Sequence, residues 1–93
     1  VCENNQWSEM TPTASMVRNT SMAERARGLG ITAWEIDGCA PFAVRDAVYK
    51  ALVEIAGGAG PVFLDCQTVR LGGHYNADIE HYRPSEDRAA AVA

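Results

Sequence analysis

The amino-acid sequence predicts an α/β fold with a parallel sheet and crossover helices, and two observations carry this prediction. Short apolar segments typical of buried strands alternate with longer segments whose apolar residues recur every three or four positions, as on one face of a helix. Such alternation implies parallel strands with each helix crossing back over the sheet. The 93 residues are enough for one small domain.

Composition favours a globular protein and argues against several functional classes. The hydrophobic share is 47% and the net charge is −4, and no basic stripe suits nucleic acid or an anionic membrane surface. No apolar run approaches the roughly 20 residues that span a bilayer. Three widely spaced cysteines do not form a disulfide framework or a zinc site, so we expect reduced thiols in a cytoplasmic protein. These cysteines are Cys2, Cys39 and Cys66.

The first third of the chain is predicted to hold the end of a strand, a loop and a helix. Residues 1–2 are apolar and typical of the end of a buried strand, whereas the polar residues 6–20 show no period and indicate a loop. Ser21 stands three positions before Glu24, which is the spacing of a capping box at the start of a helix. The glycines in 28–30 are expected to end that helix.

The middle of the chain is predicted to form a strand and a long amphipathic helix. The strand covers 31–36, and Pro41 suits the first turn of the helix that follows. The glycine-rich residues 57–60 end this helix. Its expected apolar face follows helical spacing and consists of Val44, Ala47, Val48, Ala51, Leu52 and Ile55.

The last third of the chain is predicted to form a strand, a polar loop and a final helix. The strand begins at 61 and runs on through 69, and a helix opens at 84–87. Ligands of parallel sheets bind at the carboxyl ends of the strands. Two polar, aperiodic segments leave those ends, and we expect both to be site loops: residues 3–12 and 70–83.

The first of these loops carries a pair of asparagines, Asn4 and Asn5, followed two positions later by Trp7. Asparagine supplies a neutral amide oxygen, which is a suitable ligand for a hard cation such as Mg²⁺. Taken alone, the pair is more typical of a turn in which the two side chains hydrogen-bond to the backbone.

The second loop carries Arg70, Gly72-Gly73 and His74. The glycines allow the backbone to approach a ligand closely. Arg70 and His74 offer hydrogen-bond donors to a phosphate, and histidine also transfers protons near neutral pH. Taken alone, the same residues fit an exposed loop without a ligand.

Together these segments resemble the α subunit of thiamine-diphosphate-dependent 2-oxo acid and acetoin dehydrogenases. Residues 3–7, Glu-Asn-Asn-Gln-Trp, resemble the end of the thiamine diphosphate motif, which begins with Gly-Asp-Gly and closes with Asn-Asn. The similarity covers the whole chain in the same order. It continues through Thr11-Pro12, Ile36-Asp37-Gly38, Gly60-Pro61, Arg70, Gly73-His74, Asp78 and Tyr82-Arg83.

The resemblance implies a role for each matching residue. Asn5 matches the side-chain ligand of Mg²⁺, and Trp7 stands where the family uses a backbone carbonyl as another ligand. Asn4 matches the amide that supports the cofactor site. His74 matches the histidine that contacts the diphosphate, and we assign it a catalytic role as well. Arg70 matches the arginine that orders the cofactor loop.

The resemblance also implies how the second loop is held closed. Asp78, Tyr82 and Arg83 match the residues that pin this loop over the cofactor. Mitochondrial relatives carry a regulatory serine directly after the loop histidine. Here that position is Tyr75, so the corresponding phosphorylation switch is expected to be missing.

The activity implied is that of a thiamine-diphosphate- and Mg²⁺-dependent dehydrogenase acting on a pyruvate-like 2-oxo acid or on acetoin. The implied partners are a β subunit and a lipoyl-bearing acyltransferase that accepts the acyl group. Residues 1–93 would then be part of a thiamine-diphosphate-binding domain whose Gly-Asp-Gly half lies upstream, and the isolated chain is expected to be inactive. Two alternatives remain: a non-catalytic α/β module for another phosphorylated ligand, and a remnant without a ligand.

Overall fold

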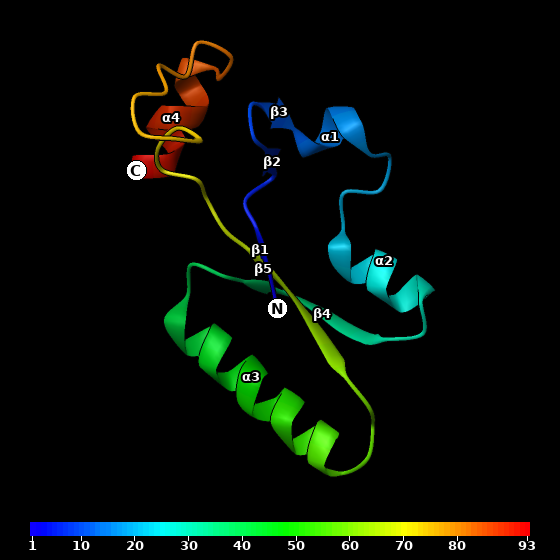
Figure 1. Ribbon diagram of the computed structural model, residues 1–93. Coiled ribbons are helices and arrows are strands. Elements are labelled where there is room, and N and C mark those ends of the chain that lie inside the picture. The colour runs from blue at the N-terminus through cyan, green and yellow to red at the C-terminus, as the bar shows by residue number, and fades with distance from the viewer.

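A computed structural model describes residues 1–93, and its centre is a three-stranded parallel sheet (Figure 1). The strands are β1 (Cys2–Asn4), β4 (Thr32–Asp37) and β5 (Val62–Gln67), in the order β1-β5-β4. Both neighbours run parallel to β5, the central strand. The predicted α/β fold class, a parallel sheet with crossover helices, is therefore confirmed.

Two helices cover the two faces of this sheet. Helix α2 (Met22–Gly28) precedes β4, and α3 (Pro41–Ala56) connects β4 to β5. Successive side chains of a strand point to opposite faces. Ala33 of β4 is buried with the alanines of α2, and the next residue, Trp34, lies under Lys50 of α3 with 4.4 Å between its ring and the Lys50 Nζ.

Helix α2 begins as the sequence predicts. The Ser21 side chain accepts a hydrogen bond from the Glu24 N–H at 3.1 Å, which satisfies one of the donors left free at a helix start. Ala23 and Ala26 of this helix are buried against Ala33, and their small side chains let the helix lie close to the sheet. Helix α2 packs on both β4 and β5.

The apolar face predicted for α3 is only partly buried. Ala51 is buried and Val44 and Ala47 are half-buried, as predicted, but Val48, Leu52 and Ile55 are exposed. Helix α3 packs on β4 and β5, and the sheet has no further strand beyond β4 to cover the rest of the helix. The apolar stripe of α3 is thus broader than the sheet beneath it.

The segment predicted as a loop over 6–20 contains short regular elements. Strands β2 (Trp7–Ser8) and β3 (Thr11–Pro12) pair antiparallel, and a one-turn helix, α1 (Thr13–Met16), follows. The loop prediction was wrong here because a two-residue strand is too short to show an alternating pattern. The prediction for β5 was also wrong at its end: the strand stops at Gln67 instead of running on through residue 69.

The final helix, α4 (Ser85–Val92), begins close to the predicted position and buries none of its residues. It lies with β2 and β3 beyond one end of the sheet (Figure 1). All three cysteines are free thiols, as expected, and burial raises the pKa of the Cys2 and Cys66 thiols above the ordinary value. No helix combines the length and the apolar character that crossing a membrane requires.

Gly38 directly follows the end of β4, and the atoms around it leave no space for a side chain. Its N–H donates to the Gln67 carbonyl at 2.7 Å. A Cβ atom at this position would lie 2.6 Å from the Thr68 methyl carbon and 2.8 Å from the Gln67 carbonyl oxygen. The close approach of the two strand ends therefore depends on glycine at residue 38.

We predict that Gly38→Ala destabilises the protein by about 1–3 kcal/mol, because the added methyl overlaps backbone that cannot move away. Gly28→Ala is the matched control, since nothing lies within 4 Å of a Cβ at the end of α2. Urea unfolding of both variants measures the difference. Equal stability of the two variants would show that the contact at residue 38 relaxes freely.

Candidate functional site

The carboxyl ends of β1 and β5 lie side by side, because Asn4 is paired with Gln67 in the register of the sheet. The chain leaves these two strands in the same direction, and the two predicted site loops meet there (Figure 1). They enclose an open hollow of about 230 Å³, together with one side of α4. Its lining residues are Asn5, Gln6, Trp7, Thr68, Val69, Arg70, Arg83, Asp87, Ala90 and Ala91.

The asparagine pair forms a tight turn at the entrance to this hollow. The Asn4 side-chain oxygen accepts from the Gln6 N–H at 3.3 Å, and the Asn5 oxygen accepts from the Trp7 N–H at 3.0 Å. Gln6 between them has a φ of 67°, in the left-handed region that residues other than glycine rarely adopt. Its side chain donates to the Gln67 side-chain oxygen at 2.8 Å.

The two asparagines differ in accessibility. Asn4 is buried and both ends of its amide are bonded within the protein, because its Nδ2 donates to the Asp65 carboxylate at 3.1 Å. Asn5 is half-buried and lines the hollow, as does Trp7. An amide oxygen has two lone pairs, so the Asn5 oxygen keeps one acceptor site after bonding to Trp7.

The donor set at the hollow suits a hard cation that brings other ligands with it. Asn5 and the main chain at Trp7 offer neutral oxygens, which Mg²⁺ accepts in its octahedral shell. No group of three or more histidine, cysteine, aspartate or glutamate side chains gathers anywhere in the chain to hold a metal. The residues therefore fit a Mg²⁺ ion that takes its remaining ligands from a phosphorylated molecule or from outside this chain.

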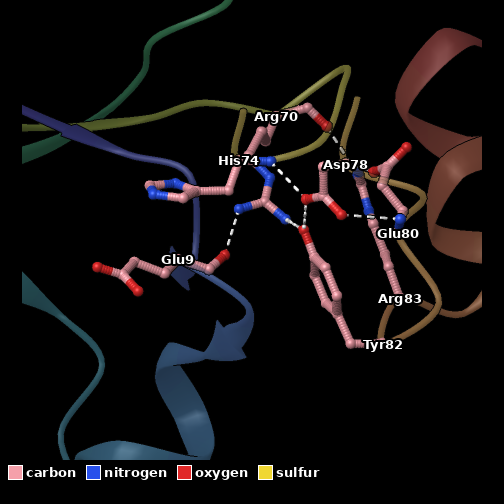
Figure 2. A network of polar contacts seen from close by, with 7 residues as sticks. All are labelled: Glu9, Arg70, His74, Asp78, Glu80, Tyr82 and Arg83. Carbon is pink, nitrogen blue, oxygen red and sulfur yellow. Dashed lines mark hydrogen bonds and ion pairs between the residues drawn. The ribbon is translucent and has the colours of Figure 1, made fainter. Parts of the chain in front are cut away.

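Arg70 joins the two loops (Figure 2). Its guanidinium donates through Nη1 to the Glu9 main-chain carbonyl and through Nη2 to the Tyr82 hydroxyl at 2.8 Å. The same guanidinium lies 5.0 Å from the centre of the Trp7 ring. One side chain thus connects the end of β5 to the turn after β2 and to the far end of the second loop.

The Tyr82 hydroxyl is the next link in this network. It donates to the Asp78 carboxylate at 2.6 Å, and the same carboxylate accepts from the His74 N–H at 2.8 Å and from the Glu80 N–H at 2.9 Å (Figure 2). The Tyr82 hydrogen bond, with help from the two N–H groups, lowers the pKa of Asp78 from 3.8 to about 2. Desolvation and the Asp78 carboxylate raise the pKa of Tyr82 above 10.0.

Arg83 closes the network at the start of α4. It is buried, forms an ion pair with Glu80 at 3.0 Å, and donates from Nη2 to the Arg70 carbonyl at 2.7 Å. The Nε atoms of Arg70 and Arg83 are both buried without a hydrogen-bond partner. Both guanidinium groups lie at the hollow, and the exposed, negatively charged side chain of Asp87 lines it as well.

His74 does not line the hollow. Its side chain is exposed, and Figure 2 shows the imidazole directed away from Asp78 and Tyr82. The sequence predicted that the backbone at Gly72-Gly73 approaches a ligand closely. In the structure Gly73 instead approaches the Asp78 side chain, which would lie 2.5 Å from a Cβ at this position. In this arrangement Gly73 lets the loop fold onto its own aspartate, which explains the glycine without a ligand.

Sequence reasoning missed Asp65. This residue of β5 has no exposed surface, and its carboxylate accepts from the Asn4 side chain and from the N–H groups of Met22 and Ala23 in the first turn of α2. The available signal was a lone acid within the apolar run 62–66, since charged side chains are almost never fully buried unless they are paired. The sequence alone does not indicate the hydrogen-bond partners of Asp65, because they lie far from it along the chain.

Comparison with known proteins gives one family match over nearly the whole chain. The model of the family described as dehydrogenase E1 component matches residues 1–92. The chain belongs to this family. The resemblance recognised in the sequence is therefore confirmed.

Relatives with known names support the same assignment. The α subunit of acetoin:2,6-dichlorophenolindophenol oxidoreductase is 36% identical in Cupriavidus necator, over 89% of this chain and 25% of the relative. The Bacillus subtilis subunit of that name is 32% identical, over 95% of this chain and 26% of the relative. The α subunit of the pyruvate dehydrogenase E1 component from Zymomonas mobilis is 34% identical, over 94% and 25%. The chain thus spans about a quarter of the length of these relatives.

We predict that the Tyr82–Asp78 contact is lost at both extremes of pH. The Asp78 pKa is lowered on folding, so its contribution to stability is present above pH 3.8 and disappears as the pH falls toward about 2. The Tyr82 pKa is raised on folding, so its contribution is complete below pH 10.0 and disappears as the pH rises past the raised value.

Ultraviolet titration of tyrosinate tests the alkaline side. One tyrosine should ionise late, Tyr82→Phe should remove that late step, and Asp78→Asn should shift it toward lower pH. A late step that survives in Tyr82→Phe would contradict the assignment.

Proposed function

We propose that this chain forms one side of a thiamine diphosphate and Mg²⁺ site in a dehydrogenase E1 component. The observation that carries the proposal is the meeting of the two loops at one hollow, which is lined by Asn5 and Trp7 from the first loop and Arg70 from the second. Family membership supports it, because that family is generally dependent on thiamine diphosphate. When bound, this cofactor supplies the cleavage of a bond next to a carbonyl carbon.

The residues of the first loop would hold the metal. Asn5 offers its free amide acceptor site and Trp7 its main-chain carbonyl, and both stand on the hollow. Asn4 would support them from beneath, since both ends of its amide are bonded inside the protein. Neutral ligands leave the charge of the ion to be balanced by the diphosphate and by a carboxylate from outside this chain.

The residues of the second loop would hold the diphosphate. Arg70 places a guanidinium group at the hollow, which would attract an anion, and Arg83, paired with Glu80, would hold the loop in place. We assign His74 to the diphosphate and to proton transfer, and its exposed position on a glycine-containing loop requires the loop to turn its imidazole inward when the cofactor binds.

The substrate and partner assignments come from the relatives. We propose a pyruvate-like 2-oxo acid or acetoin as the substrate, because the relatives are named for pyruvate and acetoin. The relatives are α subunits, so we propose a β subunit as the partner that completes the site. A lipoyl-bearing acyltransferase would accept the acyl group.

Asn5→Ala should raise the Mg²⁺ concentration needed for half-maximal thiamine diphosphate binding by at least about tenfold, with the fold unchanged. The affected group is a ligand oxygen on the surface of the hollow. Calorimetric titration of the full protein measures the change.

Asn19→Ala is the control for this variant. Asn19 also accepts from a main-chain N–H two residues ahead, but it lies at the start of α2 and away from the hollow. Its loss should lower stability and leave the Mg²⁺ requirement alone. An unchanged Mg²⁺ requirement in Asn5→Ala would count decisively against the metal assignment.

Cofactor should protect the second loop, residues 71–83, from proteolysis. Its apolar side chains Leu71, Tyr75 and Ile79 are exposed, so the loop depends mainly on polar contacts, among them Arg70–Tyr82, Tyr82–Asp78 and Arg83–Glu80. Limited proteolysis with and without thiamine diphosphate and Mg²⁺ measures the protection. Equal cleavage rates in the two conditions would refute it.

A further inference from the structure

Asp65, in the middle of β5, is a carboxylate with no exposed surface. Removing a carboxylate from water is costly unless hydrogen bonds replace the lost hydration. Neither of the two salt bridges in the protein includes Asp65, so neutral donors alone stabilise it. These donors are the Asn4 side-chain amide at 3.1 Å, the Met22 N–H at 2.9 Å and the Ala23 N–H at 3.1 Å.

The two oxygens of this carboxylate have different tasks. Oδ2 accepts both N–H groups from the first turn of α2, and Oδ1 accepts only from the Asn4 Nδ2. Capping the helix therefore uses one oxygen and leaves the other for Asn4. Oδ1 acts as a hydrogen-bond acceptor here, so the NH₂ end of the Asn4 amide is the end that faces it.

The orientation of Asn4 in turn shapes the turn that follows. With its NH₂ group held by Asp65, the Asn4 oxygen faces the Gln6 N–H and accepts from it at 3.3 Å. Gln6 adopts a left-handed φ of 67°, which is unfavourable for a residue with a side chain. The Asn4 bond helps to offset that cost, and the resulting turn sets Asn5 and Trp7 on the wall of the hollow.

We propose that Asp65 is a positioning residue for the metal ligands at Asn5 and Trp7, and that it acts through Asn4. The inference rests on the proposed function for its metal readout. It also predicts a change in the turn that needs no ligand, so its failure can be told apart from failure of the proposed function. The competing account is that Asp65 only caps α2.

The test compares Asp65→Asn with Ser21→Ala in the full protein. Asp65→Asn keeps an acceptor for α2 but places an NH₂ group against the NH₂ group of Asn4. Ser21→Ala removes a different hydrogen bond from the same helix start and leaves Asn4 untouched, so it lowers stability without touching the linkage to the turn. Two readouts are taken: the Mg²⁺ concentration for half-maximal thiamine diphosphate binding, and hydrogen exchange of the Gln6 and Trp7 amides without ligand.

We expect Asp65→Asn to raise the Mg²⁺ requirement about tenfold or more and to speed exchange of both amides, because a lost supporting partner commonly weakens metal binding by 10–100-fold. Ser21→Ala should lower the unfolding midpoint and change neither readout. Asn4→Ala should reproduce the effect of Asp65→Asn, and the double variant should be no worse than either single variant, since all three break one linkage.

Asn4→Ala also carries the test if Asp65→Asn does not fold, because it leaves Asp65 bonded to both N–H groups of α2. The proposal is overturned if Asp65→Asn, or Asn4→Ala in its place, lowers stability and leaves the exchange of the Gln6 and Trp7 amides unchanged. If the unsubstituted protein binds no thiamine diphosphate with Mg²⁺, the proposed function fails, and the amide exchange still decides whether Asp65 positions the turn.

Discussion

The Asp65 carboxylate is buried in the centre of the parallel sheet, and it constrains every group that must hydrogen-bond to it. It connects β5 to the side chain that ends β1 and to the first turn of α2. The hydrophobic core cannot fix the relative positions of these elements, because it is built largely from alanines. Hydrogen bonds to one buried acid therefore set the geometry of the strand ends from which the site loops depart.

Beyond the strand ends, the arrangement depends on Arg70. Its guanidinium bonds to the Glu9 carbonyl on one loop and to the Tyr82 hydroxyl on the other, so the two walls of the hollow are tied together by one side chain. Gly73 permits the Asp78 carboxylate to fold back onto the loop and receive Tyr82. Arg70 and Arg83, which close the loop, also line the hollow, so the contacts that set its shape include two guanidinium groups.

Local patterns predicted the elements with strong periodicity or clear punctuation. The Ser21–Glu24 spacing marked the start of α2, and Pro41 marked the start of α3. Patterns could not show that Leu52 and Ile55 stay exposed, because that depends on how many strands lie beneath α3. They gave the two site loops but missed Asp65, whose partners at residues 4 and 22–23 are distant in sequence. The exposed direction of His74 is likewise a property of the folded loop.

We propose that this chain contributes Mg²⁺ ligands and diphosphate contacts to a thiamine diphosphate site. Calorimetric titration of the full protein, together with its partner subunit, with thiamine diphosphate tests it most directly when performed with and without Mg²⁺. We expect saturable binding of thiamine diphosphate that requires Mg²⁺ and is not displaced by ATP. Binding of ATP in the absence of any thiamine diphosphate binding would contradict it and would favour a module for a different phosphorylated ligand.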